Sequence, residues 1–231
     1  MRTAEKIPVY IGYDPVESGA FWTCASSLLE TSSVPVEIIP LKRSQLPLTR
    51  ARDPKQSNEF AFTRWLVPHL QNYQGYGIFV DCDFIFLRDI ADLWFLRNPE
   101  YAVQVCKHSS DVFKAGTKYL GTEQTVYDKK CWSSLMLFNC AHEACERLTP
   151  SYIDRANGLN LHQFSWCNDN QIGSLPLEWN WLAGLYPKMD GINAVHYTEG
   201  GPYFKDYAEC DYAEEFWSAF ETMKHVQNGL T

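Results

Sequence analysis

The chain has 231 residues, enough for one sizeable core and short for two, so a single domain over residues 1–231 is predicted. Hydrophobic residues make up 45% of the chain and charged residues 21%, as in soluble globular proteins, and no apolar stretch is long enough to span a bilayer. The net charge of −8 and the lack of a Lys/Arg cluster exclude nucleic-acid binding through phosphate neutralisation.

The N-terminus and the cysteines indicate the compartment. Residues 1–6 are polar and lead directly into a strand-like run, so no signal peptide is predicted. The eight cysteines form no Cys-x-x-Cys motif and no zinc-like spacing with histidine. Several lie in apolar surroundings, which predicts buried free thiols in a reducing compartment. A cytoplasmic location is therefore predicted, with peripheral membrane contact left open.

The first part of the chain has the pattern of a β-α-β unit. Residues 7–12 predict a strand that ends in a Gly-Tyr-Asp-Pro turn. Ser18 is expected to cap a helix that runs to about Glu30, and residues 34–39 predict a second strand. A polar surface loop over 40–57 follows. This order is typical of an α/β fold with a mostly parallel sheet between helices.

The later elements are expected as an alternation of short strands and helices. They are a helix over 58–70, strands over 76–80, 101–106, 134–139 and 192–195, helical pieces over 89–96, 143–148 and 152–157, and a closing helix over 208–225. Residues 107–131 are polar and irregular. A loop of this length in a compact domain is usually functional or disordered.

Two carboxylates interrupt the apolar run over 79–87. On an extended backbone Asp81 and Asp83 point the same way, whereas Cys82 points to the other side. Two like charges beside a core are costly unless a positive group lies between them, and Mg²⁺ and Mn²⁺ prefer carboxylate oxygens. The triplet favours a divalent-metal site; the alternative is a strand end whose acids face water.

His196 is the second candidate ligand. It follows the last predicted strand, and a neutral imidazole is a suitable third ligand to an ion held by two acids. Gly200 and Gly201 follow closely, and their N–H groups are candidates for binding phosphate oxygens. A packed histidine beside a tight turn is the alternative, and the two acids shift the balance toward a ligand.

Three residues are candidates for contacts with a nucleotide. Arg64 lies among aromatic residues, so either a salt bridge with Asp81 or a substrate contact is expected. Tyr13 and Asp14 follow the carboxyl end of the first strand, where α/β sheets bind ligands. Tyr13 is expected to stack on a base and Asp14 to accept a hydrogen bond from a ribose or base; an ordinary Asp-Pro turn is the alternative. The chain lacks Gly-x-Gly-x-x-Gly and Walker motifs, which disfavours the usual dinucleotide and P-loop chemistry.

Two polar segments are candidates for contacts with a sugar. Residues 167–173 place several polar side chains between apolar segments, where they suit sugar hydroxyls; helix capping explains one of them but not all. Residues 179–181 read Trp-Asn-Trp, with an amide between two rings. This segment lines the same pocket or belongs to the core around a turn.

Together these features resemble glycosyltransferase family 8, a family with the GT-A fold that includes glycogenin and bacterial lipooligosaccharide galactosyltransferases. The resemblance is strongest over Phe79–Trp94, in the order apolar strand, Asp-x-Asp, apolar run, Asp-Ile and Leu-Trp. The other segments follow in the family's order, from about residue 7 to about residue 205. The resemblance implies a single Rossmann-like GT-A domain with a central sheet flanked by helices.

The resemblance also implies residue roles. Asp81, Asp83 and His196 would bind Mn²⁺, or Mg²⁺, on the diphosphate of a UDP-sugar, next to Cys82 and the Gly200–Gly201 pair. Tyr13 and Asp14 would hold the uridine, and Arg64 the donor and the acids. The residues that match positions near the reacting sugar, as catalytic candidates, are Asp169, Asn170 and Gln171.

Two departures from the family pattern are visible. Trp132 stands where the family often has asparagine, and Lys205 is displaced from the position of a phosphate-binding lysine, a role for which Lys118 is a candidate. The predicted function is a retaining transfer of a hexose from a UDP-sugar to a hydroxyl of a carbohydrate, lipid-linked glycan or protein. The alternatives are a nucleotidyltransferase that makes a nucleotide-sugar and a non-catalytic carbohydrate-binding module.

Overall fold

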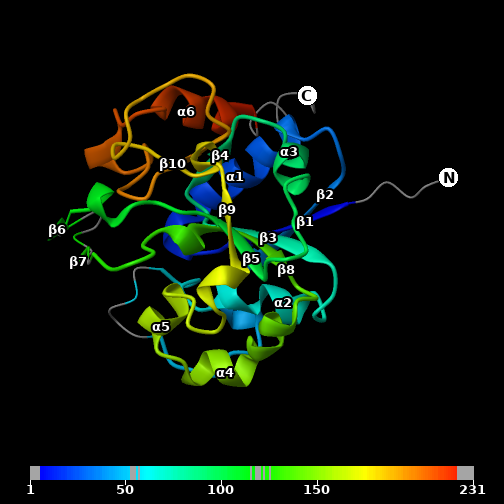
Figure 1. Ribbon diagram of the computed structural model, residues 1–231. Helices are drawn as coiled ribbons and strands as arrows, with labels where there is room; N and C mark the ends of the chain where they lie inside the picture. Colours follow the sequence, from blue (N-terminus) through cyan, green and yellow to red (C-terminus); the bar gives the residue numbers. More distant parts are fainter. Residues whose placement is uncertain are drawn as a thin grey trace.

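The computed structural model describes residues 6–52, 56, 58–114, 116–117, 121, 123–124 and 126–222. Its centre is a six-stranded sheet with the order β2-β1-β3-β8-β5-β9 (Figure 1). The strands are β1 (Ile7–Gly12), β2 (Val36–Leu41), β3 (Tyr76–Val80), β5 (Val103–Cys106), β8 (Leu135–Asn139) and β9 (Ile172–Leu175). β1 is parallel to β2 and β3, and β5 is parallel to β9, whereas β8 runs antiparallel to both β3 and β5.

Helices cover both faces of this sheet, which confirms the predicted α/β class (Figure 1). On one side lie α1 (Ser18–Thr31), α3 (Ile90–Trp94) and α6 (Ala213–Thr222). On the other side lie α2 (Val67–Leu70), α4 (Pro150–Arg155) and α5 (Gly158–His162). The expectation of one domain over residues 1–231 stays a prediction.

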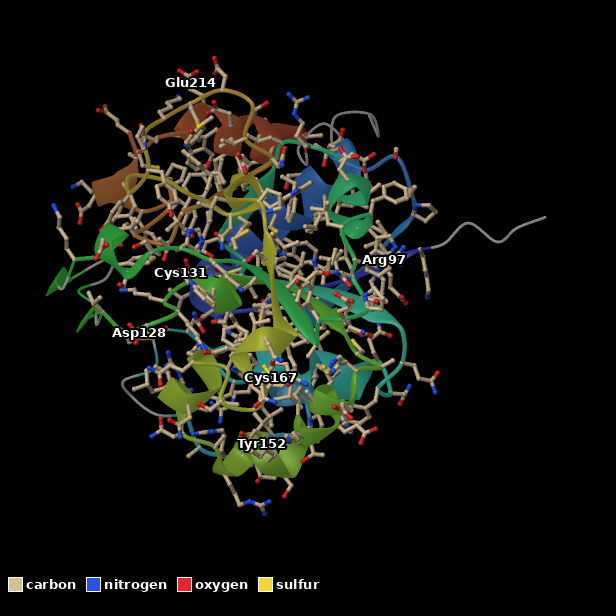
Figure 2. The ribbon with its side chains drawn as sticks, viewed as in Figure 1. Arg97, Asp128, Cys131, Tyr152, Cys167 and Glu214 are labelled. Carbon is tan, nitrogen blue, oxygen red and sulfur yellow. The ribbon has the colours of Figure 1, made fainter. Side chains whose placement is uncertain are left out.

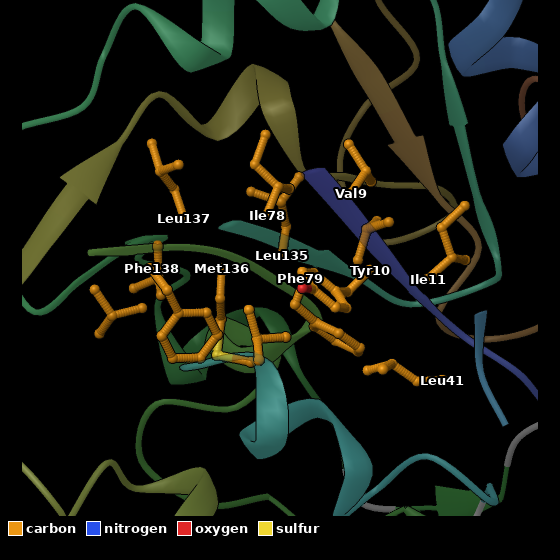
Figure 3. Packing of buried hydrophobic residues seen from close by; sticks show 14 of the residues in the cluster. Val9, Tyr10, Ile11, Leu41, Ile78, Phe79, Leu135, Met136, Leu137 and Phe138 are labelled. Atoms are coloured by element: carbon orange, nitrogen blue, oxygen red, sulfur yellow. The ribbon is translucent and has the colours of Figure 1, made fainter. Parts of the chain in front are cut away.

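The central strands carry apolar side chains on both faces, because both faces are covered. Side chains alternate along each strand, so Ile78 and Leu137 point to one face, and Phe79 and Met136 to the other (Figure 3). All four are at most 1% exposed. Because both faces of the sheet are apolar and covered, the polar side chains gather at an edge of the sheet, where its strands end.

A smaller sheet with the order β10-β11-β4 stands beside the larger one. Its strands are β4 (Phe84–Phe86), β10 (Trp181–Leu182) and β11 (Ala194–His196). It has its own apolar cluster, which includes Ile85, Val195, Tyr197 and Phe216. A third, two-stranded sheet pairs β6 (Gly116–Thr117) with β7 (Glu123–Gln124), within the region that was expected to be irregular.

The expectation that Asp81 and Asp83 share one extended strand is wrong. β3 ends at Val80 and β4 begins at Phe84, so residues 81–83 form a turn. The N–H of Asp81 donates to the carbonyl of Ser134, the residue before β8 of the larger sheet, at 2.9 Å, and the carbonyl of Asp83 accepts from Tyr197 N beyond β11 at 2.9 Å. The chain crosses from one sheet to the other within these three residues.

Helix α1 begins at Ser18 itself, so the expected cap at Ser18 is wrong. Its N-cap is Glu17, which makes no side-chain capping bond. Asp14 instead caps the preceding 3₁₀ turn, because its side chain accepts from Val16 N. Cys24 and Leu28 are fully buried on the inner face of α1.

Several element boundaries also differ from the predictions. The helix expected over 58–70 is a turn, a 3₁₀ segment (Thr63–Leu66) and the short α2, whose Pro68 lacks an N–H donor. β2 continues through Pro40, which an edge strand tolerates. Helix α5 was missed, α6 begins later than expected, and residues 57 and 223–225 lie outside the described residues.

Candidate active site

Asp81, Asp83 and His196 meet where the two sheets adjoin. Each offers one ligand atom, and these atoms lie within 4.8 Å of one another. The pairing of β11 with β4 explains the meeting, because His196 lies opposite Phe84, the residue that follows Asp83. All three residues are buried, at 9%, 8% and 2% exposure respectively. The structure therefore brings together the three residues that the sequence named, and their binding of a metal stays a prediction.

The donor set of this group fits a divalent cation. Two carboxylates and one imidazole nitrogen are ligands that Mn²⁺ accepts, and the carboxylates also suit Mg²⁺. Nε2 of His196 lies 3.5 Å from Oδ2 of Asp83. The imidazole stacks on the ring of Phe84, with 4.3 Å between ring centroids, so its plane is fixed. A cation held here would lie between groups of like charge.

Arg64 forms the salt bridge with Asp81 that was one of its two expected roles. Nη1 of Arg64 lies 2.9 Å from Oδ1 of Asp81 and donates to the carbonyl of Ser133 at 2.8 Å. Nε donates to the carbonyl of Phe60 at 3.3 Å. The residue is 4% exposed, so the guanidinium is a fixed positive charge on one side of the acids.

Tyr13 and Asp14 lie at the same edge of the larger sheet, but they differ in what they offer. Tyr13 lines a cavity of about 470 Å³ together with Lys42, Arg43 and Arg52. Asp14 is 4% exposed, and its two oxygens accept from the backbone N–H groups of Val16 and Glu59. Asp14 therefore holds the loop beside the cavity, and its contact with a nucleoside stays a prediction.

Cys82, Gly200 and Gly201 are placed by packing. The thiol of Cys82 is fully buried in the core. Gly200 has φ +144°, and a Cβ there would lie 2.7 Å from the ring of Tyr207. Its N–H donates to the carbonyl of Tyr197 in this structure, and its contact with a phosphate stays a prediction. The N–H of Gly201 stays a candidate.

Asp169, Asn170 and Gln171 form a 3₁₀ turn directly before β9. Ile172 pairs with Val103, the first residue of β5, whereas the acids follow the last residue of β3. The turn therefore lies at the opposite edge of the sheet from the acids, where β5 and β9 begin. The side chain of Asp169 is 84% exposed and forms an ion pair with Lys129, which lowers the pKa of Asp169.

The polar residues behind the acids were not recognised as a group from the sequence. Oγ of Ser133 shares a hydrogen bond of 2.8 Å with Nδ1 of His162, and Oγ of Ser134 accepts a hydrogen bond from the amide nitrogen of Asn180. Asn180 had been singled out between its two tryptophans, and it is fully buried. Ser134 begins the strand that is expected over 134–139, and nothing in the local pattern of Ser133 or Ser134 indicates these partners. Lys118 lies outside the described residues.

His108 lies next to this site, and its burial predicts how the stability of the protein depends on pH. The residue is 3% exposed, and Nδ1 is 2.9 Å from Tyr186 Oη. Burial, with a smaller effect of His196, lowers the pKa of His108 to about 3. An unfolded chain gives histidine a pKa of about 6.5, so between these values only the unfolded state takes up the proton.

We therefore expect the contribution of His108 to the free energy of unfolding to be fully present above about pH 6.5. It should fall toward pH 3, by up to about 1.4 kcal/mol per pH unit. Urea unfolding at stepped pH measures it in the wild type, in His108→Gln and in Tyr186→Phe. The His108→Gln variant should lose less stability on acidification, and Tyr186→Phe should follow the wild type. Equal pH slopes for wild type and His108→Gln would contradict the prediction.

Comparison with known proteins adds a relative. No family model matches the chain. Over 230 residues the chain is 40% identical to Protein CDI of Arabidopsis thaliana, an alignment that covers 95% of the chain and 88% of that protein. The chain belongs to the Protein CDI family. Among the described residues of this family member, no helix has the length and apolar character needed to cross a membrane.

Solved structures show which fold this member of the Protein CDI family has. The glycosyltransferase GlyE of Streptococcus pneumoniae TIGR4, in its apo form, superposes with a TM-score of 0.64 and 15% identity, over 94% of this chain and 60% of that chain. An active-site mutant of LgtC superposes with a TM-score of 0.59 and 12% identity, over 94% of this chain and 96% of that chain. The bifunctional glycosyltransferase WbbM gives 0.65 and 14%, over 95% of this chain and 50% of that chain.

The chain thus spans between half and two thirds of GlyE and WbbM and nearly all of LgtC. These likenesses show a GT-A glycosyltransferase fold, which confirms the resemblance that the sequence predicts.

Proposed function

We propose that the chain is a metal-dependent glycosyltransferase that moves a hexose from a UDP-sugar to a hydroxyl of a carbohydrate, lipid-linked glycan or protein, with retention of configuration. The observation that carries the proposal is the convergence of Asp81, Asp83 and His196 within 4.8 Å in a GT-A fold. One neighbour with this fold is described as a galactosyltransferase in complex with donor and acceptor sugar analogs.

The residues present fit the proposed metal. Asp81, Asp83 and Nε2 of His196 would hold Mn²⁺, or Mg²⁺, on the diphosphate. When bound, the ion neutralises the charge that develops on the departing UDP. Arg64 holds the carboxylate of Asp81 in place from the opposite side. Tyr13, which lines the cavity, is our candidate for stacking on the nucleobase.

The proposed step forms a bond between the acceptor oxygen and carbon 1 of the sugar and breaks the bond between carbon 1 and the phosphate. The acceptor attacks from the face that UDP leaves, and the departing phosphate takes the acceptor proton. Asp169, Asn170 and Gln171 are our candidates for contacts with the donor sugar, at a turn that is open to solvent. A peptide isolated with a sugar on Asp169 would show that the reaction proceeds by double displacement and not by front-face attack.

The compartment is proposed on the thiols. None of the eight cysteines, all of which the structure describes, forms a disulfide, as in proteins of reducing compartments, and we propose the cytoplasm.

The test is incubation of the protein with a panel of UDP-sugars and Mn²⁺, with UDP release as the measured quantity. We expect slow hydrolysis of one or a few UDP-hexoses, and none when EDTA removes the metal. ADP- and GDP-sugars serve as matched controls for the nucleotide. Absence of UDP binding by calorimetry together with absence of UDP release would overturn the proposal.

The two alternatives give different results in the same experiment. A nucleotidyltransferase would release pyrophosphate from UTP in the presence of a sugar 1-phosphate. A carbohydrate-binding module would bind glycans and give no heat with UDP and Mn²⁺.

A further inference from the structure

A single buried amide contacts the imidazole of the candidate metal ligand. Nδ1 of His196 lies 2.9 Å from Oδ1 of Asn180, and Asn180 is fully buried. The amide nitrogen of Asn180 lies 2.8 Å from Oγ of Ser134 and 3.4 Å from the carbonyl oxygen of Cys131. Three polar groups therefore surround this amide, and their chemistry determines how it is oriented.

The orientation follows from which groups donate. Oγ of Ser134 lies 2.6 Å from the carbonyl oxygen of Cys131, and a carbonyl only accepts, so the hydroxyl proton is directed there. The group of Asn180 that faces both this hydroxyl and the same carbonyl must be a donor. The NH₂ group is the only donor that Asn180 has, so its oxygen faces His196.

The orientation of the amide in turn assigns the protons of the ring. Oδ1 of Asn180 only accepts, so Nδ1 of His196 carries a proton. In the neutral ring, Nε2 then carries the lone pair. Nε2 is also the atom that lies 3.5 Å from Oδ2 of Asp83, inside the group of candidate ligand atoms. The tautomer with the free nitrogen toward the acids is the one that can bind a cation.

The anchor of this arrangement is a strained residue. Cys131 has φ 60° and ψ 0°, a left-handed conformation that is uncommon for residues other than glycine. Figure 2 shows Cys131 at the level of the sheet, between the helices drawn above and below it. This conformation places its carbonyl oxygen where both Ser134 and Asn180 donate to it.

We propose that Asn180 is a positioning residue that holds His196 as its Nδ1–H tautomer, with Nε2 directed to a divalent cation. The metal part of this inference rests on the proposed function, whereas the tautomer part concerns the metal-free protein. Asn180 acts through His196 and does not itself bind the ion. Ser134 and the carbonyl of Cys131 keep the amide from turning over.

The tautomer is measured directly in the full chain without metal. Long-range ¹H–¹⁵N correlation spectra of histidine-labelled protein at about pH 8, where an ordinary histidine is neutral, distinguish the two ring nitrogens. We expect protonated Nδ1 and unprotonated Nε2 at His196 in the wild type and in Asn180→Asp, which keeps an acceptor. In Asn180→Ala and Ser134→Ala we expect a mixture of the two tautomers.

The matched control is Asn139→Ala. Asn139 is another buried asparagine, at the far end of β8, and its amide nitrogen donates to the carbonyl of Pro99 at 3.2 Å. This variant loses a buried amide and stability in the same way, but we expect the His196 tautomer to be unchanged. A tautomer in Asn180→Ala identical to that of the wild type, or protonated Nε2 in the neutral wild type, would overturn the proposal.

The affinity for Mn²⁺, measured by calorimetry, is the second readout. Loss of an outer hydrogen-bond partner of a metal ligand typically weakens binding by about 10–100-fold, which we expect for Asn180→Ala and not for Asn139→Ala. Wild-type protein that shows the expected tautomer but binds no Mn²⁺ would refute the proposed function and leave the role of Asn180 in orienting the ring supported. Equal Mn²⁺ affinity in Asn180→Ala and wild type would refute the metal part of the inference.

Discussion

Replacement of Asp83 by alanine is expected to abolish Mn²⁺-dependent release of UDP, with a loss of turnover on the order of 10²–10³-fold or more. Its carboxylate is one of three candidate ligands, and its Oδ2 lies 3.5 Å from Nε2 of His196. Removing it also removes a like charge from beside Asp81. The metal-free variant should therefore unfold at a urea concentration no lower than the wild type.

The measurement is UDP release and Mn²⁺ binding in the same preparation. Asp92→Ala is the matched control, because Asp92 is an exposed acid on α3, nine residues further along the chain. The control should keep both activity and metal affinity. Full Mn²⁺-dependent activity in Asp83→Ala would show that the metal site is wrongly assigned.

Replacement of Arg64 by methionine is expected to have the largest effect on stability, a loss of about 3–5 kcal/mol. Methionine keeps most of the volume but leaves the carboxylate of Asp81 and the carbonyls of Ser133 and Phe60 without the guanidinium that donates to them. Buried acceptors that lose a charged donor bear most of the cost. Urea unfolding followed by circular dichroism measures the change.

Two further variants separate charge from shape. Arg64→Lys keeps the charge but cannot reach three acceptors at once, so an intermediate loss is expected. In Arg64→Met combined with Asp81→Asn, the loss should be smaller than the sum of the two single losses, because no buried charge remains uncompensated. A loss below about 1 kcal/mol in Arg64→Met would place this ion pair among the weak surface pairs instead.

The sequence predicted five of the six strands of the larger sheet, because long apolar runs with turn residues at their ends are local signals, but it missed β9. Residues 7–12 and 76–80 were predicted with the bounds that β1 and β3 have. The same patterns missed α5, because Asn157 and Gly158 indicate a loop. In the structure the side chain of Asn157 instead accepts from Leu159 N and Asn160 N and caps the helix.

The site was predicted in composition but not in its local backbone. The alternation of Asp81, Cys82 and Asp83 suggested one strand, and the actual turn depends on β4 leaving the larger sheet to pair with β11. That pairing joins residues more than one hundred positions apart, so no local pattern contains it. For the same reason the partners of Asn180 were unpredictable, since Cys131 and Ser134 lie about fifty positions earlier in the chain.

If the proposed ion binds, the short turn over residues 81–83 would also link its binding to the contact between the two sheets. Asp81 is fastened by its backbone to one sheet and Asp83 to the other, while His196 belongs to the second. An ion bound by all three residues would connect the two sheets at the place where they adjoin. Because such an ion would bind only when the three residues are together, it would stabilise the docked arrangement of the two sheets relative to a separated one. If the proposed ion binds, filling of the site and docking of the two sheets would therefore be one linked equilibrium.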